Sequence, residues 1–87
     1  MSIAAEEVQH HHLVNIVVNK QPVRIEGPKA TGLQIKEAAI AAGVNIELSF
    51  QLSEKLGDHR TKVIGDTDEV TLHEGAEFVA VADDDNS

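Results

Sequence analysis

The sequence predicts an α+β domain in which one helix packs on a face of a mixed β-sheet. β-branched residues dominate segments 13–18 and 23–25, which favours strands. An alanine-rich segment of helix-forming residues follows at 32–42, and apolar residues alternate with polar ones over 47–53 and recur in strand-like spacing at 77–82. Because a single helix has to cover the apolar face of all the strands, the chain is expected to form an α+β roll.

The first two strands are expected to form a β-hairpin. Segments 13–18 and 23–25 are separated by residues 19–22, whose composition is typical of a turn. A connection follows at 27–32, where Pro28 cannot donate a hydrogen bond to a neighbouring strand. The hairpin is therefore expected to end at this connection.

The helix is predicted over residues 32–42. Thr31 is a suitable N-cap residue, and Gly43 stands where a left-handed residue often ends a helix. Two apolar stripes run along this helix. Ile35 and three alanines form one stripe, whereas Leu33 and Ile40 lie nearly opposite to it.

The second half of the chain is predicted to contain further strands. Alternation over 47–53 predicts a strand with one buried face and places Phe50 in the core. The other expected elements are a loop at 54–60, a short strand at 61–64, a single helical turn at 68–72 and a last strand at 77–82. This order, ββαβ(β)β, is that of a β-grasp fold.

The chain is expected to hold one domain flanked by two extensions. It has 87 residues, and domains usually have about 50 to 200. Residues 13–82 are expected to form the domain, with a flexible N-terminal extension at 1–12 and an acidic tail at 83–87. Cysteine is absent from the sequence, which excludes disulfides and thiolate metal sites.

Charge and hydropathy exclude two classes of partner. Fifteen acidic against seven basic residues give a formal net charge of -8, the wrong sign for binding phosphates. Nucleic acids and anionic membranes are therefore not expected as partners. The apolar runs are much shorter than the roughly 18 residues that a bilayer span requires, so a cytoplasmic protein is expected.

No catalytic site, metal site or cofactor is predicted. The three histidines at 10–12 could offer imidazoles to a metal ion, but adjacent residues in an extension do not hold a tetrahedral geometry, and a solvated arm is favoured. His59 beside Asp58, and His73 near several carboxylates, are interpreted as surface residues because no nucleophile or pocket accompanies them. The chain is not expected to be an enzyme.

Four segments, at 14–19, 31–39, 48–52 and 78–81, resemble the bacterial ubiquitin-like proteins, especially the multi-ubiquitin domains encoded beside activating, conjugating and deubiquitinase-like enzymes. The resemblance extends over residues 13–82. It implies a ubiquitin-like β-grasp modifier whose C-terminus is adenylated, passed between these enzymes and joined to a target. A role in defence against phage is a further implication of the resemblance.

The C-terminal residues depart from the pattern of this family. Ubiquitin and the sulfur carriers of thiamin and molybdopterin synthesis end in Gly-Gly, whereas Ala82 here is followed by Asp83 and the chain runs to Ser87 without a glycine. Three alternatives remain open: an enzyme trims the tail, a terminus without glycine is joined to the target, or the protein is not conjugated. Ala82, Asp83 and Ser87 are the tail residues assigned to processing or conjugation, and the missing Gly-Gly argues against a sulfur carrier.

A surface for protein contacts is expected on the sheet and on the helix. The residues assigned to it are Leu13, Val17, Leu33, Ile40, Phe78 and Ala80. For the two helix residues a second interpretation remains open, in which Leu33 lies under a loop and Ile40 is a single exposed apolar residue.

The N-terminal extension is a candidate cover for the apolar strand at 13–18. Its residues Ile3 and Val8 are expected to contact that strand, in their own domain or in a neighbouring copy. Two functions therefore remain open. The first is a modifier that acts through protein contacts and its C-terminus, and the alternative is a scaffold that forms homo-oligomers and is never conjugated.

Overall fold

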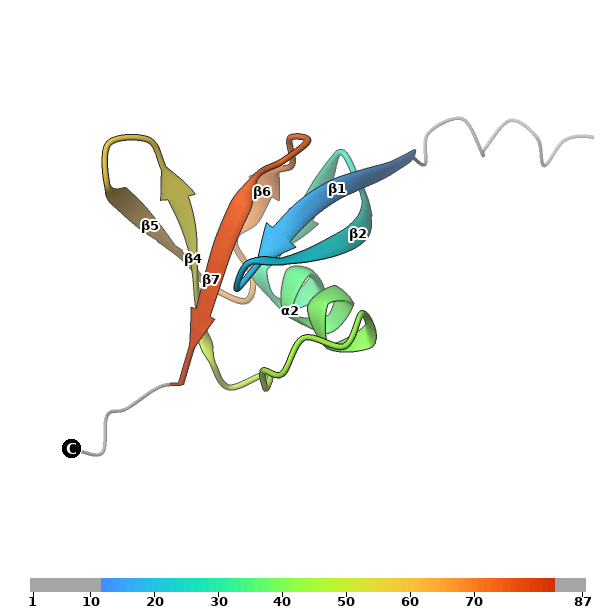
Figure 1. The fold of residues 1–87 in the computed structure, drawn as a ribbon, viewed down its shortest axis with the longest axis horizontal. Coiled ribbons are helices and arrows are strands. Elements are labelled where there is room, and N and C mark those ends of the chain that lie inside the picture. Colours follow the sequence, from blue (N-terminus) through green and yellow to red (C-terminus); the bar gives the residue numbers. More distant parts are fainter. Residues whose placement is uncertain (1–11, 83–87) are drawn as a thin grey trace, which may run out of the picture.

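The computed structural model describes residues 12–82, which form one helix and seven strands (Figure 1). The elements are β1 (His12–Val18), β2 (Gln21–Gly27), β3 (Lys29–Thr31), α2 (Gly32–Ala41), β4 (Gln51–Leu56), β5 (Arg60–Ile64), β6 (Glu69–Thr71) and β7 (Glu77–Val81). Five strands form a sheet in the order β2-β1-β7-β4-β5, and β3 pairs with β6 in a second sheet. The pairing of β1 with β7 is parallel and the other pairs are antiparallel. The predicted α+β β-grasp fold is confirmed.

The hairpin of β1 and β2 turns through two residues only. Asn19 and Lys20 both have positive φ angles, 51° and 68°, as in the two-residue turns whose twist matches that of antiparallel strands. The predicted turn at 19–22 was thus too long, since Gln21 and Pro22 belong to β2. Proline is tolerated there because β2 is an edge strand, where a missing donor leaves no partner unpaired.

Helix α2 begins and ends with the signals that the sequence shows. The hydroxyl of Thr31 accepts a hydrogen bond from the backbone N–H of Gln34 at 3.2 Å, and the Gln34 side-chain oxygen accepts one from the N–H of Thr31 at 2.8 Å. Gly43 has a φ of 98° just after the helix. Gly32 has to be glycine, because a Cβ atom there would collide with the carbonyl oxygen of Gly65.

The strand predicted at 47–53 begins later than expected, at Gln51. Residues 47–50 form a turn, closed by a hydrogen bond of 3.0 Å from the N–H of Phe50 to the carbonyl of Glu47. The predicted loop at 54–60 was too long, because β4 continues to Leu56 and pairs there with Arg60, so that only residues 57–59 connect the two strands. Cross-strand pairing with β5 and β7 therefore outweighs the polar composition of this segment.

The helical turn predicted at 68–72 was also wrong. Glu69–Thr71 is strand β6, which pairs with Lys29–Thr31 of β3. This second strand pair joins the connection at 27–32 to the segment that was predicted to be a helical turn. The backbone N–H and C=O groups of the two short strands form hydrogen bonds with each other. The two strands lie far apart in the sequence, so no local pattern indicates their pairing.

The core lies between α2 and the five-stranded sheet. Its largest buried side chains are Phe78, Ile16, Ile35, Leu52 and Val18. Phe78 is 1% exposed, whereas Phe50 is only partly buried against the edge of the core. The prediction that Phe50 lies in the core was wrong in part, because residues 47–50 turn before β4 begins and leave the ring packed against the core without being buried in it.

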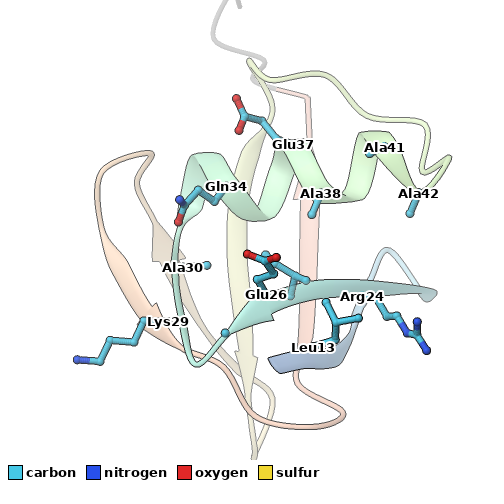
Figure 2. A pocket seen from close by; sticks show the side chains of 12 residues that line it. Leu13, Arg24, Glu26, Lys29, Ala30, Gln34, Glu37, Ala38, Ala41 and Ala42 are labelled. Atoms are coloured by element: carbon cyan, nitrogen blue, oxygen red, sulfur yellow. The ribbon is translucent and has the colours of Figure 1, made fainter. Parts of the chain in front are cut away.

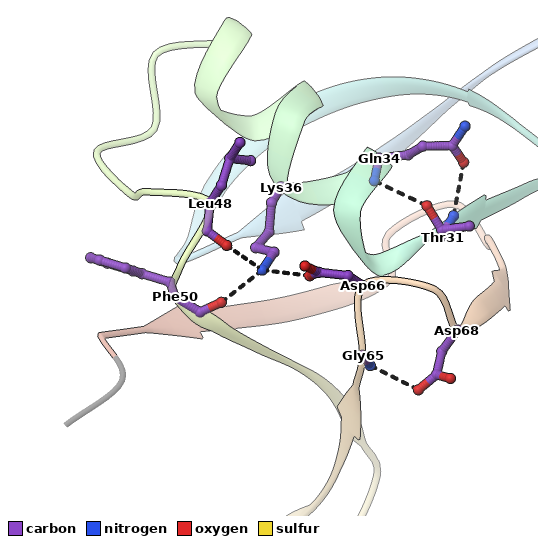
Figure 3. Close-up of polar contacts among 8 residues, drawn as sticks. All are labelled: Thr31, Gln34, Lys36, Leu48, Phe50, Gly65, Asp66 and Asp68. Carbon is purple, nitrogen blue, oxygen red and sulfur yellow. Dashed lines mark hydrogen bonds and ion pairs between the residues drawn. The ribbon is translucent and has the colours of Figure 1, made fainter. Parts of the chain in front are cut away.

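A buried lysine ties the helix to two loops (Figure 3). The ammonium of Lys36, a residue only 4% exposed, donates to the carbonyl oxygens of Leu48 at 2.6 Å and Phe50 at 2.9 Å. It also forms an ion pair of 2.8 Å with the carboxylate of Asp66. These three acceptors compensate the burial of its charge.

Among residues 12–82, the helix is too short and too polar to cross a membrane.

The two phenylalanines are expected to differ in their contribution to stability. Phe78→Ala should lower the free energy of unfolding by about 3 to 5 kcal/mol, because it empties a central core position. Phe50→Ala should cost less than about 2 kcal/mol, since that ring is only half-buried. Urea denaturation of both variants checks this, and equal losses would show that the core is assigned incorrectly.

Replacing the buried lysine should destabilise the fold more than removing its exposed partner. Lys36→Met leaves two backbone carbonyls and a carboxylate without their donor, at an expected cost of about 2 to 4 kcal/mol. Asp66→Asn should cost less than about 1 kcal/mol, because the Asp66 side chain is 54% exposed. Thermal and urea unfolding give both values, and a stable Lys36→Met protein would contradict the role assigned to the ammonium.

Candidate functional site

The sheet face that points away from α2 carries exposed valines. Val63, Val79 and Val81 alternate with the buried Ile64 and Ala80, so their side chains lie on the outer face. The strand register sets Ser53 of β4 between Val63 and Val79. We call Val63, Val79 and Val81 the outer valine patch. Val63 is 56% exposed and Val81 is 51% exposed, whereas Val79 is half-buried.

A hollow of about 550 Å³ lies at the edge of this patch, beside the β1–β2 turn. It is lined by Val17, Asn19, Lys20, Lys55, Glu77, Phe78 and Val79, and we call it the hairpin-end hollow. Lys55 and Glu77 form an ion pair of 3.7 Å at its rim. Because both side chains are about half exposed, this pair is weak and exchangeable.

The turn beside the hollow is fixed to β7 by one side chain. The Asn19 amide donates to the carbonyl of Ala80 at 3.0 Å and accepts from the N–H of Ala80 at 2.8 Å. The backbone N–H of Asn19 also donates to the carbonyl of Phe78 at 3.0 Å. These contacts extend the pairing of β1 and β7 by one further residue, so the wall of the hollow is held in place.

A second concave surface of about 770 Å³ lies between α2 and β2. Figure 2 shows its helix wall, where Ala38 and Ala42 point towards β2. Arg24 and Glu26 contribute opposite charges from the strand, and further charged residues of both signs line it. Small side chains leave this groove open, but its charges favour no single class of partner.

The structure separates the residues that were assigned to one interaction surface. Leu13, 50% exposed, lies in the groove beside β2, and Val17 lies half-buried in the hairpin-end hollow. Ile40 is 39% exposed on the helix, where Leu33 is half-buried. Whether any of these residues binds a partner stays a prediction.

Two of the assigned residues belong to the core instead. Phe78 and Ala80 are buried beneath α2, so the expectation that they face a partner was wrong. The outward residues of β7 are Val79 and Val81. Strand alternation places Phe78 and Ala80 on one face and Val79 and Val81 on the other, but it does not say which face meets the helix. The face with Phe78 is buried because the larger phenylalanine side chain buries more apolar surface than valine does.

Several important residues were not identified from the sequence. Lys36 is a buried helix residue, and its carbonyl partners lie 12 and 14 residues away along the chain. Asn19 was interpreted as a turn residue only, because its partner Ala80 lies 61 residues further along. The turn composition was the only local signal at that position.

Some predictions fall outside the residues that the structure describes. Ile3, Val8, Asp83 and Ser87 are among them, as are the first two histidines of the cluster at 10–12. Ala82 is exposed directly after β7. Within residues 12–82, no group of three or more potential metal ligands lies close together, and His59 and His73 are exposed.

Comparison with protein families gives a match over most of the chain. The family described as multiubiquitin matches residues 14–84, a segment that includes the helix and all the strands except the first two residues of β1. Comparisons with curated proteins and with solved structures gave no match.

Proposed function

The chain belongs to the multiubiquitin family of ubiquitin-like domains, and on this premise we propose that it is a protein modifier that acts through protein contacts and through attachment of its C-terminus to targets. The proposal assigns the chemistry to activating, conjugating and deubiquitinase-like partner enzymes and treats the chain itself as non-enzymatic. Its setting in a bacterial, antiphage pathway rests on the resemblance of the sequence alone.

The observation that carries this proposal is the outer valine patch. Val63 and Val81 are more than half exposed, although the smaller Ala80 of the same sheet is buried. Neighbouring exposed apolar side chains on one sheet face are a common feature of protein-binding surfaces. The patch is not needed to cover the core, because the opposite face of the same strands contacts α2.

The position of the chain end supports attachment through the C-terminus. β7 is the middle strand of the five-stranded sheet, and its last residue, Val81, belongs to the patch. The exposed Ala82 follows immediately. A partner enzyme that binds the patch would therefore have Ala82 beside it, which suits an enzyme that acts on the segment that Ala82 begins.

A scaffold that forms homo-oligomers is the second candidate function. Exposed apolar residues also occur away from the patch, since Ile40 lies on the helix and Leu13 lies beside β2. Several apolar surfaces on different sides of one small domain favour contacts between copies.

The modifier function is tested by trapping the activated C-terminus. The full chain is incubated with its activating enzyme, ATP and a nucleophile, and intact mass should show an adduct on the native or a trimmed terminus. Val63→Ser with Val81→Ser should slow adduct formation about tenfold and change stability by less than about 0.5 kcal/mol per site, because both residues are exposed.

Ile40→Ser is the matched control, since it removes an exposed apolar residue from the helix and should leave the rate unchanged. An unchanged mass under all conditions would reject the modifier function. Equal slowing by Ile40→Ser would reject the role of the outer valine patch.

The scaffold function is tested by light scattering over a range of concentrations. As a modifier, the full chain should be a monomer, and so should a shortened chain that starts at Leu13. An oligomer formed only by the full chain would support assembly through the N-terminal extension. Oligomers of both chains would instead assign the assembly to the domain surface.

A further inference from the structure

A further hollow, of about 600 Å³, lies at the end of the sheet where a turn joins β4 and β5 (Figure 1). Two cationic side chains and an imidazole line it, from β4, from the turn and from β5: Lys55, His59 and Arg60. Glu77 is the acidic residue of its lining. We call the space between these four residues the β4–β5 hollow. It is a locally positive site on a chain whose formal net charge is -8.

The carboxylates near the two cations neutralise them only weakly. Glu77 lies 3.7 Å from the ammonium of Lys55, and Asp58 lies 4.0 Å from the guanidinium of Arg60. Both distances are longer than the roughly 2.8 Å of a good charge-assisted hydrogen bond. All four side chains are at least 45% exposed, and exposed ion pairs of this length contribute little to stability. A ligand anion can therefore replace either carboxylate.

The backbone of the turn gives an independent reason to assign a role to the imidazole. Asp58 and His59 have φ angles of 69° and 67°, as in the two-residue hairpin turns whose second residue is usually glycine. Histidine at such a position strains the backbone more than glycine would. The turn thus holds an imidazole beside the hollow although a glycine would suit its backbone better. Strain of this kind is typical of functional positions.

The lining matches the charge and the acceptors of a phosphate. Two full positive charges and an imidazole N–H offer more than one carboxylate can neutralise. A phosphate monoester carries about -1.5 to -2 charges and three acceptor oxygens, one for each of the three side chains. The guanidinium of Arg60 can also bind two of these oxygens at once. Gly57 and Gly75 have no side chains to fill the hollow, so there is room for the group that the phosphate esterifies.

The net negative charge of the chain does not exclude a single phosphate group. A nucleic acid or an anionic membrane extends over the acidic surface of the whole domain. A lone phosphate responds mainly to charges within about 8 Å at physiological ionic strength, because more distant charges are screened. The charges of the β4–β5 hollow itself therefore decide whether this small anion binds.

We propose that the β4–β5 hollow binds the phosphate group of a phosphate monoester. Arg60 and Lys55 pair with its oxygens, where the phosphate replaces Asp58 and Glu77, and the imidazole of His59 donates a hydrogen bond to a further oxygen. This inference goes beyond the proposed function, because the site requires neither an activated C-terminus nor the outer valine patch.

The test is NMR of the ¹⁵N-labelled full chain, titrated with inorganic phosphate, N-acetylphosphoserine amide and AMP at constant ionic strength. Each should shift the amide signals of Lys55, His59 and Arg60 and saturate at millimolar concentration, since the contacts are exposed. Acetate should bind at least about fivefold more weakly. Tighter binding of the phosphoserine compound would assign the site to a phosphorylated protein side chain. Tighter binding of AMP would assign it to a nucleotide, and equal binding to the phosphate group alone.

Variants that remove one charge locate the interaction. Arg60→Gln and Lys55→Gln should each weaken phosphate binding about three- to fivefold. Glu77→Gln should strengthen it about twofold, because it removes the carboxylate that competes for Lys55. Lys62→Gln is the matched control, since it removes the same charge from β5 outside the hollow and should have no effect.

The variant His59→Gly separates binding from folding. It should weaken phosphate binding about twofold without lowering the melting temperature, because glycine adopts the positive φ of the turn without strain. A merely structural role of His59 would not produce this combination. The amide spectra show whether each variant is folded.

Three results would overturn the proposal. The first is that phosphate at tens of millimolar causes no saturable shifts at the β4–β5 hollow. The second is that acetate binds as tightly as phosphate. The third is that Lys62→Gln weakens binding as much as Arg60→Gln, which would assign the effect to the overall charge of the chain.

Discussion

The ammonium of Lys36 is the contact on which the arrangement of this fold depends. It is buried, and its three acceptors come from the segment before β4 and from the loop after β5. By binding the carbonyls of Leu48 and Phe50, it holds that segment in a turn, so that β4 begins at Gln51. The register of β4 then pairs Gln51 with Val81 of β7. The outer valine patch is assembled by that register.

The elements that the sequence predicts well are those whose signals are local. The capping box of Thr31 and Gln34 lies within four residues, and the β-branched run of β1 is continuous. The short strands β3 and β6 were missed because each exists only through the other, and about forty residues separate them in the chain. The start of β4 was misplaced for the same reason, since a lysine on the helix determines it.

The candidate site shows the same division between local and distant signals. Alternation along β7 correctly places Phe78 and Val79 on opposite faces of the sheet. The residues on both faces are apolar, so only the position of the helix determines which face is buried. Val17 was assigned to the outer face and lies in the hairpin-end hollow. Its neighbours there, Lys20 and Lys55, come from different strands or turns, so no pattern along the chain could place them together.

The alternation along β7 also explains how one strand can serve both the fold and a partner. Phe78 and Ala80 contact the core, whereas Val79 and Val81 face outward, and pairing with β1 and β4 fixes the strand on both sides. The outer residues can therefore change with little loss of core burial, while the inner ones cannot. Asn19 binds both backbone groups of Ala80, so the strand remains paired up to the point where the C-terminal residues begin. The outer face and the exposed Ala82 that follows β7 are thus held in one fixed geometry, as the proposed attachment by a partner enzyme would require.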